Sequence, residues 1–192
     1  MIVGSLIKNP GGGIAPTGGY IAGKKDLIEQ ISYRFTTPSL GREVGSYASG
    51  YRLFYQGLFM APSIVKNALM GNVLTSYALS FVDIKTMPRP GDMPYDIINS
   101  IKFDTPEGLK NFCRTIQAVS PVESYVTPEA WDMPGYPNQV IMAAGTFIEG
   151  ATLELSADGT IRQNPPYIAY LQGGLTYEHY KLAITKVLQY NF

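Results

Sequence analysis

The chain has 192 residues, with 15 lysines and arginines against 15 aspartates and glutamates, so its formal net charge is zero and no overall field directs it to nucleic acid or to an anionic membrane. With 45% hydrophobic and 16% charged residues it can bury a sizeable core, which excludes a disordered chain. This length suggests one domain, or one large domain with a smaller appendage.

Apolar runs, helical spacing and proline breaks predict the order of helices and strands. The predicted elements are strands at 1–7 and 17–23, helices at 24–35, 41–60, 62–81 and 105–119, strands at 140–147, 151–157 and 167–171, and a final helix at 176–190. The strands at 140–147 and 151–157 are expected to pair. Pro62 and Pro106 stand just inside their helices, where a missing N–H costs least, and Thr105 is the expected N-cap. Residues 120–139 are expected to be irregular.

A break in the chain is predicted at residues 86–94, TMPRPGDMP, because three prolines and a glycine cannot continue a helix. We therefore expect one domain at 1–85 and a second at 86–192. Helices and strands mixed in this order are typical of an α/β fold followed by an α+β cap.

The chain has one cysteine and one histidine, which limits the kinds of disulfide and metal site that it can form. Cys113 is the only cysteine, which excludes an internal disulfide and suits a reducing cytoplasm. His179 is the only histidine, so we expect no metal site built from several histidines. The chain start lacks the pattern of a secretory signal, and no uncharged apolar run reaches the roughly 18 residues of a membrane span. A cytoplasmic protein is expected.

A lysine beside a glycine-rich loop is the first candidate for chemistry. Lys8 ends an apolar run, and Pro10 keeps Asn9 out of a helix. Desolvation at the end of a buried strand favours the neutral amine, which attacks carbonyl groups. Ser5 could bind an anionic phosphate nearby, and the glycines at 11–13 would let a flat cofactor approach the backbone. A solvated surface lysine is the alternative interpretation.

A second lysine has the spacing of a phosphate-binding loop. Gly18, Gly23 and Lys24 match that motif, but Lys25 occupies the place of its serine or threonine, and the intervening residues include two strand formers, Tyr20 and Ile21. We interpret this match as coincidental.

Several long segments occur in a specific order: GSLIKNPGGGIAPTGGYIAGKKDL, GREVG, YQGLFMAPSIV, SPVESYVTPEAWDMPGYPNQVIMAAGTFIEGATLELSADG and PPYIAYLQGGLTYEHYKLAI. Together they resemble the methionine gamma-lyase-like family, whose members are also called aluminium resistance or cystathionine beta-lyase-related proteins. The resemblance covers essentially the whole chain. It implies the end of a fold-type I pyridoxal-phosphate large domain at 1–85, with long helices, and a small α+β C-terminal domain at 86–192.

The resemblance also implies roles for individual residues. Lys8 matches the lysine that bonds to pyridoxal 5'-phosphate, and Ser5 matches the serine that contacts the cofactor phosphate. Ile7 stands where relatives often have a threonine, so that contact is lost. Arg162 is the candidate for the arginine that pairs with the substrate carboxylate, where a planar guanidinium suits two-point binding. The segment RQNPPY carries extra residues relative to the family pattern.

The function implied by the resemblance is a carbon–sulfur lyase acting on sulfur-containing amino acids and forming a homo-oligomer when intact. The resemblance is to the carboxyl-terminal part of the longer enzymes, and residues 1–7 contain no cofactor-stacking aromatic or pyridine-pairing aspartate. A fragment is therefore expected. The alternatives are a non-catalytic partner subunit of a split enzyme and another pyridoxal-phosphate reaction such as transamination. Beta and gamma elimination are not distinguished.

Other side chains have structural as well as functional interpretations. His179 is expected to be structural or at the surface, and Cys113 to be a small core residue. Glu129 and Asp132 form either a carboxylate pair or part of a solvated loop anchored by Trp131. Tyrosines that could serve a cofactor site are Tyr33, Tyr125 and Tyr136.

Overall fold

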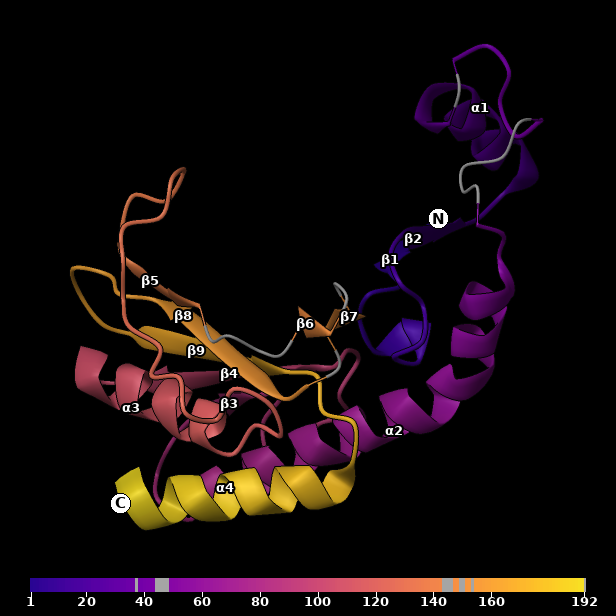
Figure 1. Ribbon diagram of the computed structural model, residues 1–192. Coiled ribbons are helices and arrows are strands. Elements are labelled where there is room, and N and C mark those ends of the chain that lie inside the picture. The colour runs from indigo at the N-terminus through magenta and orange to yellow at the C-terminus, as the bar shows by residue number, and fades with distance from the viewer. Residues whose placement is uncertain (37, 44–48, 143–146, 149–150, 153, 192) are drawn as a thin grey trace.

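The computed structural model describes residues 1–36, 38–43, 49–142, 147–148, 151–152 and 154–191. In chain order its elements are β1 Ile2–Ser5, the 3-10 helix η1 Asn9–Gly11, β2 Gly19–Ala22, α1 Lys25–Phe35, α2 Arg52–Ser80, β3 Thr86–Met87, β4 Ile98–Phe103, α3 Pro106–Ala118, β5 Val140–Met142, β6 Phe147–Ile148, β7 Ala151–Thr152, β8 Ser156–Thr160, β9 Tyr167–Gln172 and α4 Tyr177–Asn191. Figure 1 shows their arrangement, and the mixed α/β class agrees with the prediction.

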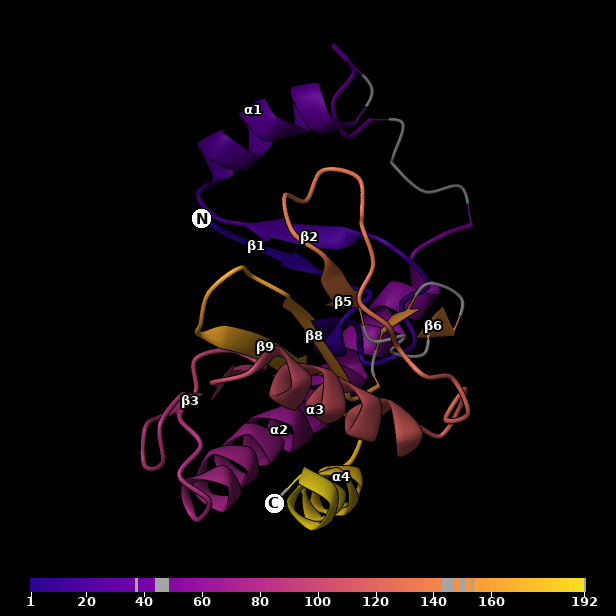
Figure 2. The same cartoon turned by 90° about the vertical axis from the view of Figure 1, so that its left-hand side faces the viewer.

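The main sheet has five antiparallel strands in the order β3-β4-β9-β8-β5. Figure 1 shows α3 and α4 on one side of it, with α2 running beneath toward the N-terminal residues. Strand residues alternate between the two faces, and Ile101, Ala169 and Leu171 are fully buried in the core with residues of α3 and α4. The opposite face keeps exposed or half-buried side chains, so we call it the open face of the sheet. Figures 1 and 2 both place the β1–β2 ribbon on that side.

The strand β4 has no counterpart among the predicted elements. Its alternation is obscured by Asn99, a polar residue that is fully buried. The Asn99 amide donates to Ser76 Oγ at 2.9 Å and to the Asn72 carbonyl at 3.1 Å, both on α2. Because those partners lie more than 20 positions upstream, local pattern could not show that this polar side chain belongs in the core.

One continuous helix replaces the two predicted at 41–60 and 62–81. The helix α2 runs from Arg52 to Ser80 with Pro62 inside it, and residues 44–48 of the earlier prediction lie outside the described part. Pro62 and Leu58 are both exposed. The carbonyl that loses its helical bond at this proline therefore lies on the solvent side, where the loss costs less than in a core.

The predicted amphipathic helix at 24–35 forms as α1, but its apolar side is not packed. Phe35 is 76% exposed and Leu27 is 40% exposed, and Ser32 is the one residue of α1 that is buried. The apolar residues spaced along one side of this helix are Leu27, Ile28, Ile31 and Phe35, and none of the four is buried.

The predicted pairing of 140–147 with 151–157 is also shifted. Val140 pairs with Thr160 and Met142 with Asp158, so β5 lies beside β8, while β6 and β7 form a separate short hairpin. Residues 143–146, 149–150 and 153 lie outside the described part. A strand pattern does not fix its register, since a shifted pairing keeps the same composition.

The helix at 105–119 was predicted closely. It forms as α3, and Thr105 Oγ1 accepts from the Gly108 N–H at 3.1 Å. The helix at 176–190 forms as α4. The division at 85 and 86 stays a prediction, because α2 packs against both η1 and α4 and so contacts both proposed domains. None of the helices in the described ranges has the length and apolarity to cross a membrane.

The strands predicted at 1–7 and 17–23 form a shorter two-stranded ribbon, β1 with β2. Ile2 pairs with Ala22 and Ser5 with Gly19, and β1 has no strand on its other side among the described residues. Ile2 and Val3 are about two-thirds exposed, at 64% and 66%. An exposed apolar strand edge is a template for pairing with another chain.

We therefore expect the isolated chain to associate as its concentration rises, and Val3→Lys to reduce that association several-fold because a charged edge strand resists pairing. Light scattering over a dilution series measures this, with Lys102→Ala on β4 as a control. A chain that stays monomeric at high concentration and unfolds cooperatively would contradict the expectation.

Candidate functional site

Lys8 lies between the ribbon and the first helical turn. It is half-buried, its backbone is extended at φ −104°, and its carbonyl accepts from the Gly11 N–H at 2.8 Å. Pro10 sits in the first turn of η1, where its ring suits the backbone. The backbone on both sides of Lys8 is therefore held by hydrogen bonds, because the Leu6 N–H also donates to the Gly18 carbonyl at 2.9 Å.

The glycines after Lys8 allow the backbone of this loop to pack closely against the backbone of α2. A Cβ atom on Gly12 would meet the Gly57 carbonyl of α2, and one on Gly57 would meet the Gly11 carbonyl. Gly12 also has φ +63°, which favours glycine. The expectation that a flat cofactor approaches the backbone at Gly11 and Gly12 is corrected, because α2 and the Leu6 carbonyl occupy that space.

Asn9 ties the Lys8 segment to the far end of the chain. It is fully buried, and its Nδ2 donates to the Gly174 carbonyl at 3.2 Å across 165 positions of sequence. The hydroxyl of Tyr180 in α4 donates to the carbonyl of the neighbouring residue, Gly173, at 2.9 Å. Burial raises the pKa of this hydroxyl. These bonds place Lys8 beside the end of β9. The Asn9 Oδ1 atom is buried and has no partner among the described residues.

The positive charge of Lys8 affects an acidic residue of β8, Asp158, although the two side chains form no ion pair among the described residues. Burial raises the pKa of the Asp158 carboxyl, and the positive charge of Lys8 opposes that rise. Asp158 is half-buried on the open face, paired in register with Tyr170 of β9. Sequence reasoning missed Asp158 as a site residue. The available signal was a carboxylate in a strand whose neighbours, Ala157 and Gly159, are small and apolar.

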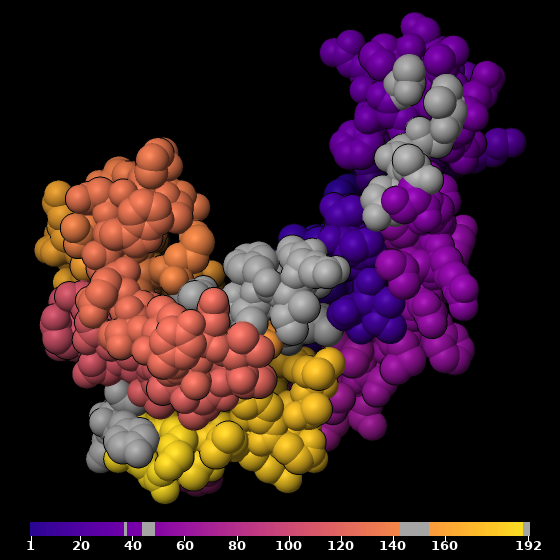
Figure 3. All heavy atoms as spheres, viewed as in Figure 1, coloured from indigo at the N-terminus to yellow at the C-terminus, as the bar shows by residue number. Residues whose placement is uncertain are grey.

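The Lys8 segment and Asp158 belong to a concave side of the molecule. Figure 3 shows that the surface is hollowed between the orange segment that includes β5 and the indigo-to-purple N-terminal residues. Both the ribbon that carries Ser5 and the strand that carries Asp158 face this side. Ser5 is the last residue of β1 and is half-buried, so it and Lys8 come from adjoining backbone.

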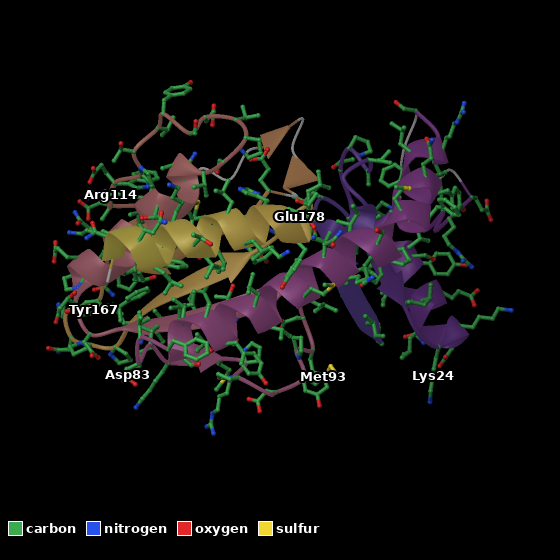
Figure 4. All side chains as sticks on the ribbon, turned by 90° about the horizontal axis from the view of Figure 1, so that it is seen from below. Lys24, Asp83, Met93, Arg114, Tyr167 and Glu178 are labelled. Atoms are coloured by element: carbon green, nitrogen blue, oxygen red, sulfur yellow. The ribbon has the colours of Figure 1, made fainter. Side chains whose placement is uncertain are left out.

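The Arg162 side chain makes no hydrogen bond or ion pair among the described residues. It is exposed in the loop between β8 and β9, and β8 runs away from the Lys8 end of the sheet before the chain reaches it. Tyr167, which opens β9 after that loop, lies at the opposite end of the molecule from Lys24 in Figure 4. The strand β8 ends at Thr160, and Arg162 follows Asp158 by four positions, which span at most roughly 14 Å. The role of Arg162 in substrate binding stays a prediction.

The remaining candidates have structural contacts. The His179 Nε2 atom lies 2.8 Å from the Val119 carbonyl, and Glu129 accepts two hydrogen bonds from Arg114 NH2, at 2.7 and 2.6 Å. Cys113 is fully buried, as predicted, and burial followed by the Asp158 charge raises its thiol pKa. Tyr20 and Ile21 form β2, which agrees with the coincidental interpretation of the phosphate-loop spacing. The three tyrosines proposed for a cofactor site are exposed: Tyr33, Tyr125 and Tyr136.

The comparisons with known proteins match this chain throughout. The family model described as methionine gamma-lyase matches residues 1–192. The uncharacterized protein YnbB of Bacillus subtilis is 50% identical over 184 residues, which cover 96% of this chain and 43% of that protein. An uncharacterized 33.9 kDa protein of Lactobacillus delbrueckii subsp. bulgaricus is 44% identical over 189 residues, which cover 98% of this chain and 61% of that protein. The chain therefore spans about half the length of these curated relatives.

Solved structures give the same match. A carbon–sulfur lyase involved in aluminium resistance from Clostridium novyi is 53% identical with a TM-score of 0.86, covering 97% of this chain and 43% of that one. A candidate cystathionine beta-lyase involved in aluminium resistance from Listeria monocytogenes is 50% identical with a TM-score of 0.89, covering 100% of this chain and 47% of that one.

Proposed function

Since this chain belongs to the methionine gamma-lyase family, we propose that it supplies the cofactor-bonding lysine, Lys8, of a pyridoxal-phosphate-dependent carbon–sulfur lyase acting on a sulfur-containing amino acid. The observation that carries the proposal is the placement of the half-buried Lys8 beside the end of β9, through the bond between Asn9 and Gly174. The relatives' names, carbon–sulfur lyase and cystathionine beta-lyase, support the reaction class.

The residues present fit one side of such a cofactor. Lys8 offers the amine, and the Ser5 hydroxyl comes from the same end of β1, where a phosphate group would accept its hydrogen bond. Because this chain spans less than half of the solved relatives, the groups against the ring and its nitrogen belong to the rest of the assembled enzyme in this proposal. When bound, pyridoxal phosphate acts as the electron sink for a carbanion at the substrate alpha carbon.

The chain's own residues would move protons. Lys8 accepts the proton of the substrate alpha carbon at Nζ, which is general-base catalysis. The Asp158 carboxylate then stabilises the ammonium ion that forms on Lys8, since opposite charges attract strongly where water is scarce. Breaking the carbon–sulfur bond leaves the electron pair on sulfur, and the thiolate takes up a proton as it departs.

A second candidate function is a subunit that becomes active only in a larger assembly. The exposed apolar side chains of α1 and the first half of α2 favour it, among them Phe35 at 76%, Tyr55 at 72% and Phe59 at 81%. Surfaces of this kind mark contacts with other polypeptide. In this proposal the site is completed by a separate polypeptide that carries the remainder of the split enzyme.

The test is the absorbance spectrum of the purified chain after pyridoxal phosphate is added and the excess is dialysed away. We expect a retained visible band that Lys8→Ala abolishes and that Lys24→Ala leaves unchanged, because Lys24 is exposed at the start of α1 (Figure 4). A band that survives in Lys8→Ala contradicts the role of Lys8. A chain with no retained band favours the second candidate function.

A further inference from the structure

The turn between β9 and α4, residues 173–175, is held by side chains at three consecutive carbonyls, and we call it the anchor turn. The three donors come from α4, from the Lys8 segment and from α2. Gly173 accepts from the Tyr180 hydroxyl at 2.9 Å, Gly174 from Asn9 Nδ2 at 3.2 Å, and Leu175 from Asn67 Nδ2 at 3.3 Å. The bond that ties down the Lys8 segment is therefore the middle one of three.

The backbone of the anchor turn depends on these bonds. Gly173 and Gly174 have φ angles of +90° and +88°, in the left-handed region that glycine enters freely. Glycine also loses more conformational freedom on folding than any other residue, so two in succession are costly to fix. The position of Gly174, and with it that of Asn9, therefore depends on what holds the carbonyls on either side.

Tyr180 fits most closely of the three donors. It is fully buried, and a Cβ atom on Gly71 of α2 or on Gly174 would overlap its ring. The ring thus occupies the space between α2 and the anchor turn that two absent side chains leave open. Figure 4 shows Glu178, in the first turn of α4, at the end of that helix toward the N-terminal residues. The ring and hydroxyl of Tyr180 together fix the anchor turn relative to α2.

The loop after Lys8 is held from two sides. One side is α2, which packs against the loop through Gly57, and the other is the anchor turn, which is reached through Asn9. Lys8 is half-buried, and its Nζ atom makes no hydrogen bond or ion pair within the part of the chain that the structure describes. The place of the amine is therefore set by its backbone.

We propose that Tyr180 and Asn67 are positioning residues for Lys8, acting on it through the anchor turn and Asn9. The inference rests on the proposed function, and it identifies residues outside the Lys8 site that determine where the amine stands. Without the Tyr180 hydroxyl the Gly173 carbonyl is free, the glycine pair gains freedom, and the bond from Asn9 weakens. The Lys8 amine then takes up several positions in place of one.

Reductive methylation of the lysines with ¹³C-labelled formaldehyde, followed by NMR, reports this position without any cofactor. Each dimethylated lysine gives a methyl signal, and Lys8→Arg identifies the signal of Lys8. Because Lys8 is half-buried, its signal should stand apart from that of an exposed lysine such as Lys24. Tyr180→Phe should reduce this separation by roughly half or more, because one of the two holds on the loop is weakened.

Two further variants separate positioning from stability. Tyr167→Phe is the matched control: it removes the hydroxyl of another buried tyrosine, at the opposite end of β9, and should leave the Lys8 signal in place. Asn67→Ala puts a better helix former into α2, so it should move the Lys8 signal without lowering the unfolding midpoint. If Tyr180→Phe does not fold, Asn67→Ala decides the question alone.

The double variant of Tyr180→Phe with Asn9→Ala tests the route. Residues that act through one segment have effects that do not add, so the double variant should move the signal no further than Asn9→Ala alone. The proposal is overturned by a signal that stays in place in folded Tyr180→Phe or in Asn67→Ala. An equal movement in Tyr167→Phe, or fully additive movements in the double variant, would overturn it as well.

Because this measurement uses no cofactor, its result is independent of the absorbance test of Lys8. A retained Lys8-dependent band with an unmoved signal in Tyr180→Phe rejects the positioning role alone. A moved signal with no such band supports the positioning role and rejects the cofactor role of Lys8 in this chain.

Discussion

Gly57→Ala is expected to destabilise the chain, although alanine in place of glycine inside a helix normally stabilises by about 0.5–1 kcal/mol. The reason is the close contact between α2 and the loop after Lys8. A Cβ atom at Gly57 would stand against the Gly11 carbonyl, and a backbone atom cannot turn aside as a long side chain can. Overpacking of this kind costs about 1–3 kcal/mol, enough to reverse the sign.

Urea unfolding measures this change in free energy. Ser63→Ala, at an exposed position of the same helix, is the matched control and should raise stability by a few tenths of a kcal/mol. The retained absorbance band of Lys8 should weaken in Gly57→Ala and persist in the control, because the loop that carries Lys8 has to shift. A Gly57→Ala chain at least as stable as the control would show that the loop and helix are not in contact.

Asn9→Asp is expected to cost more than about 3 kcal/mol at neutral pH, since it buries a charge and removes the donor to the Gly174 carbonyl. Burial raises the pKa of such a carboxyl above its unfolded value of about 3.9. The unfolded chain is then the more ionised form, so the loss is complete above the folded pKa and shrinks as pH falls through it. Once protonated, the acid can donate to Gly174 again.

The free energy of unfolding at pH 5 and pH 8 tests this, measured against the unaltered chain. The difference between Asn9→Asp and the unaltered chain should be smaller at pH 5. Asn9→Ala serves as the control, because it should lose about 1–3 kcal/mol equally at both values. A loss in Asn9→Asp that does not depend on pH would mean that position 9 is open to water.

The sequence predicted those helices and strands that are determined by residues close together in the chain. The helix α3 begins where Thr105 and Pro106 indicate, because a cap needs only its own next three residues. The strand β4 was missed and α2 was divided, because Asn99 is satisfied by α2 and Pro62 is tolerated on an exposed side. The formation of β4 depends on residues distant in sequence, and the continuity of α2 depends on exposure to solvent. The spacing of apolar residues gives no information on either.

The candidate site divides in the same way. Lys8 was a candidate from the apolar run before it and from the family resemblance, whereas Asp158 was not a candidate from sequence. Asp158 is a candidate because the bond between Asn9 and Gly174 brings the Lys8 segment to the end of β9, and the charge of Lys8 then affects the Asp158 carboxyl. Arg162 has the chemistry to bind a carboxylate, and its role stays a prediction.

The bond between Asn9 and Gly174 also bears on the order in which this protein is made. Closing a loop of 165 positions has a high entropic cost, and nothing repays it until β9 and α4 have formed. Ribosomal synthesis proceeds from the N-terminus at about 5–20 residues per second, so the Lys8 segment is made roughly ten or more seconds before its anchor emerges. During that interval the Lys8 segment lacks the hydrogen bond from Asn9 to the Gly174 carbonyl. The Lys8 segment is therefore among the last parts of this fold to be completed, because its anchor at Gly174 is synthesised after it.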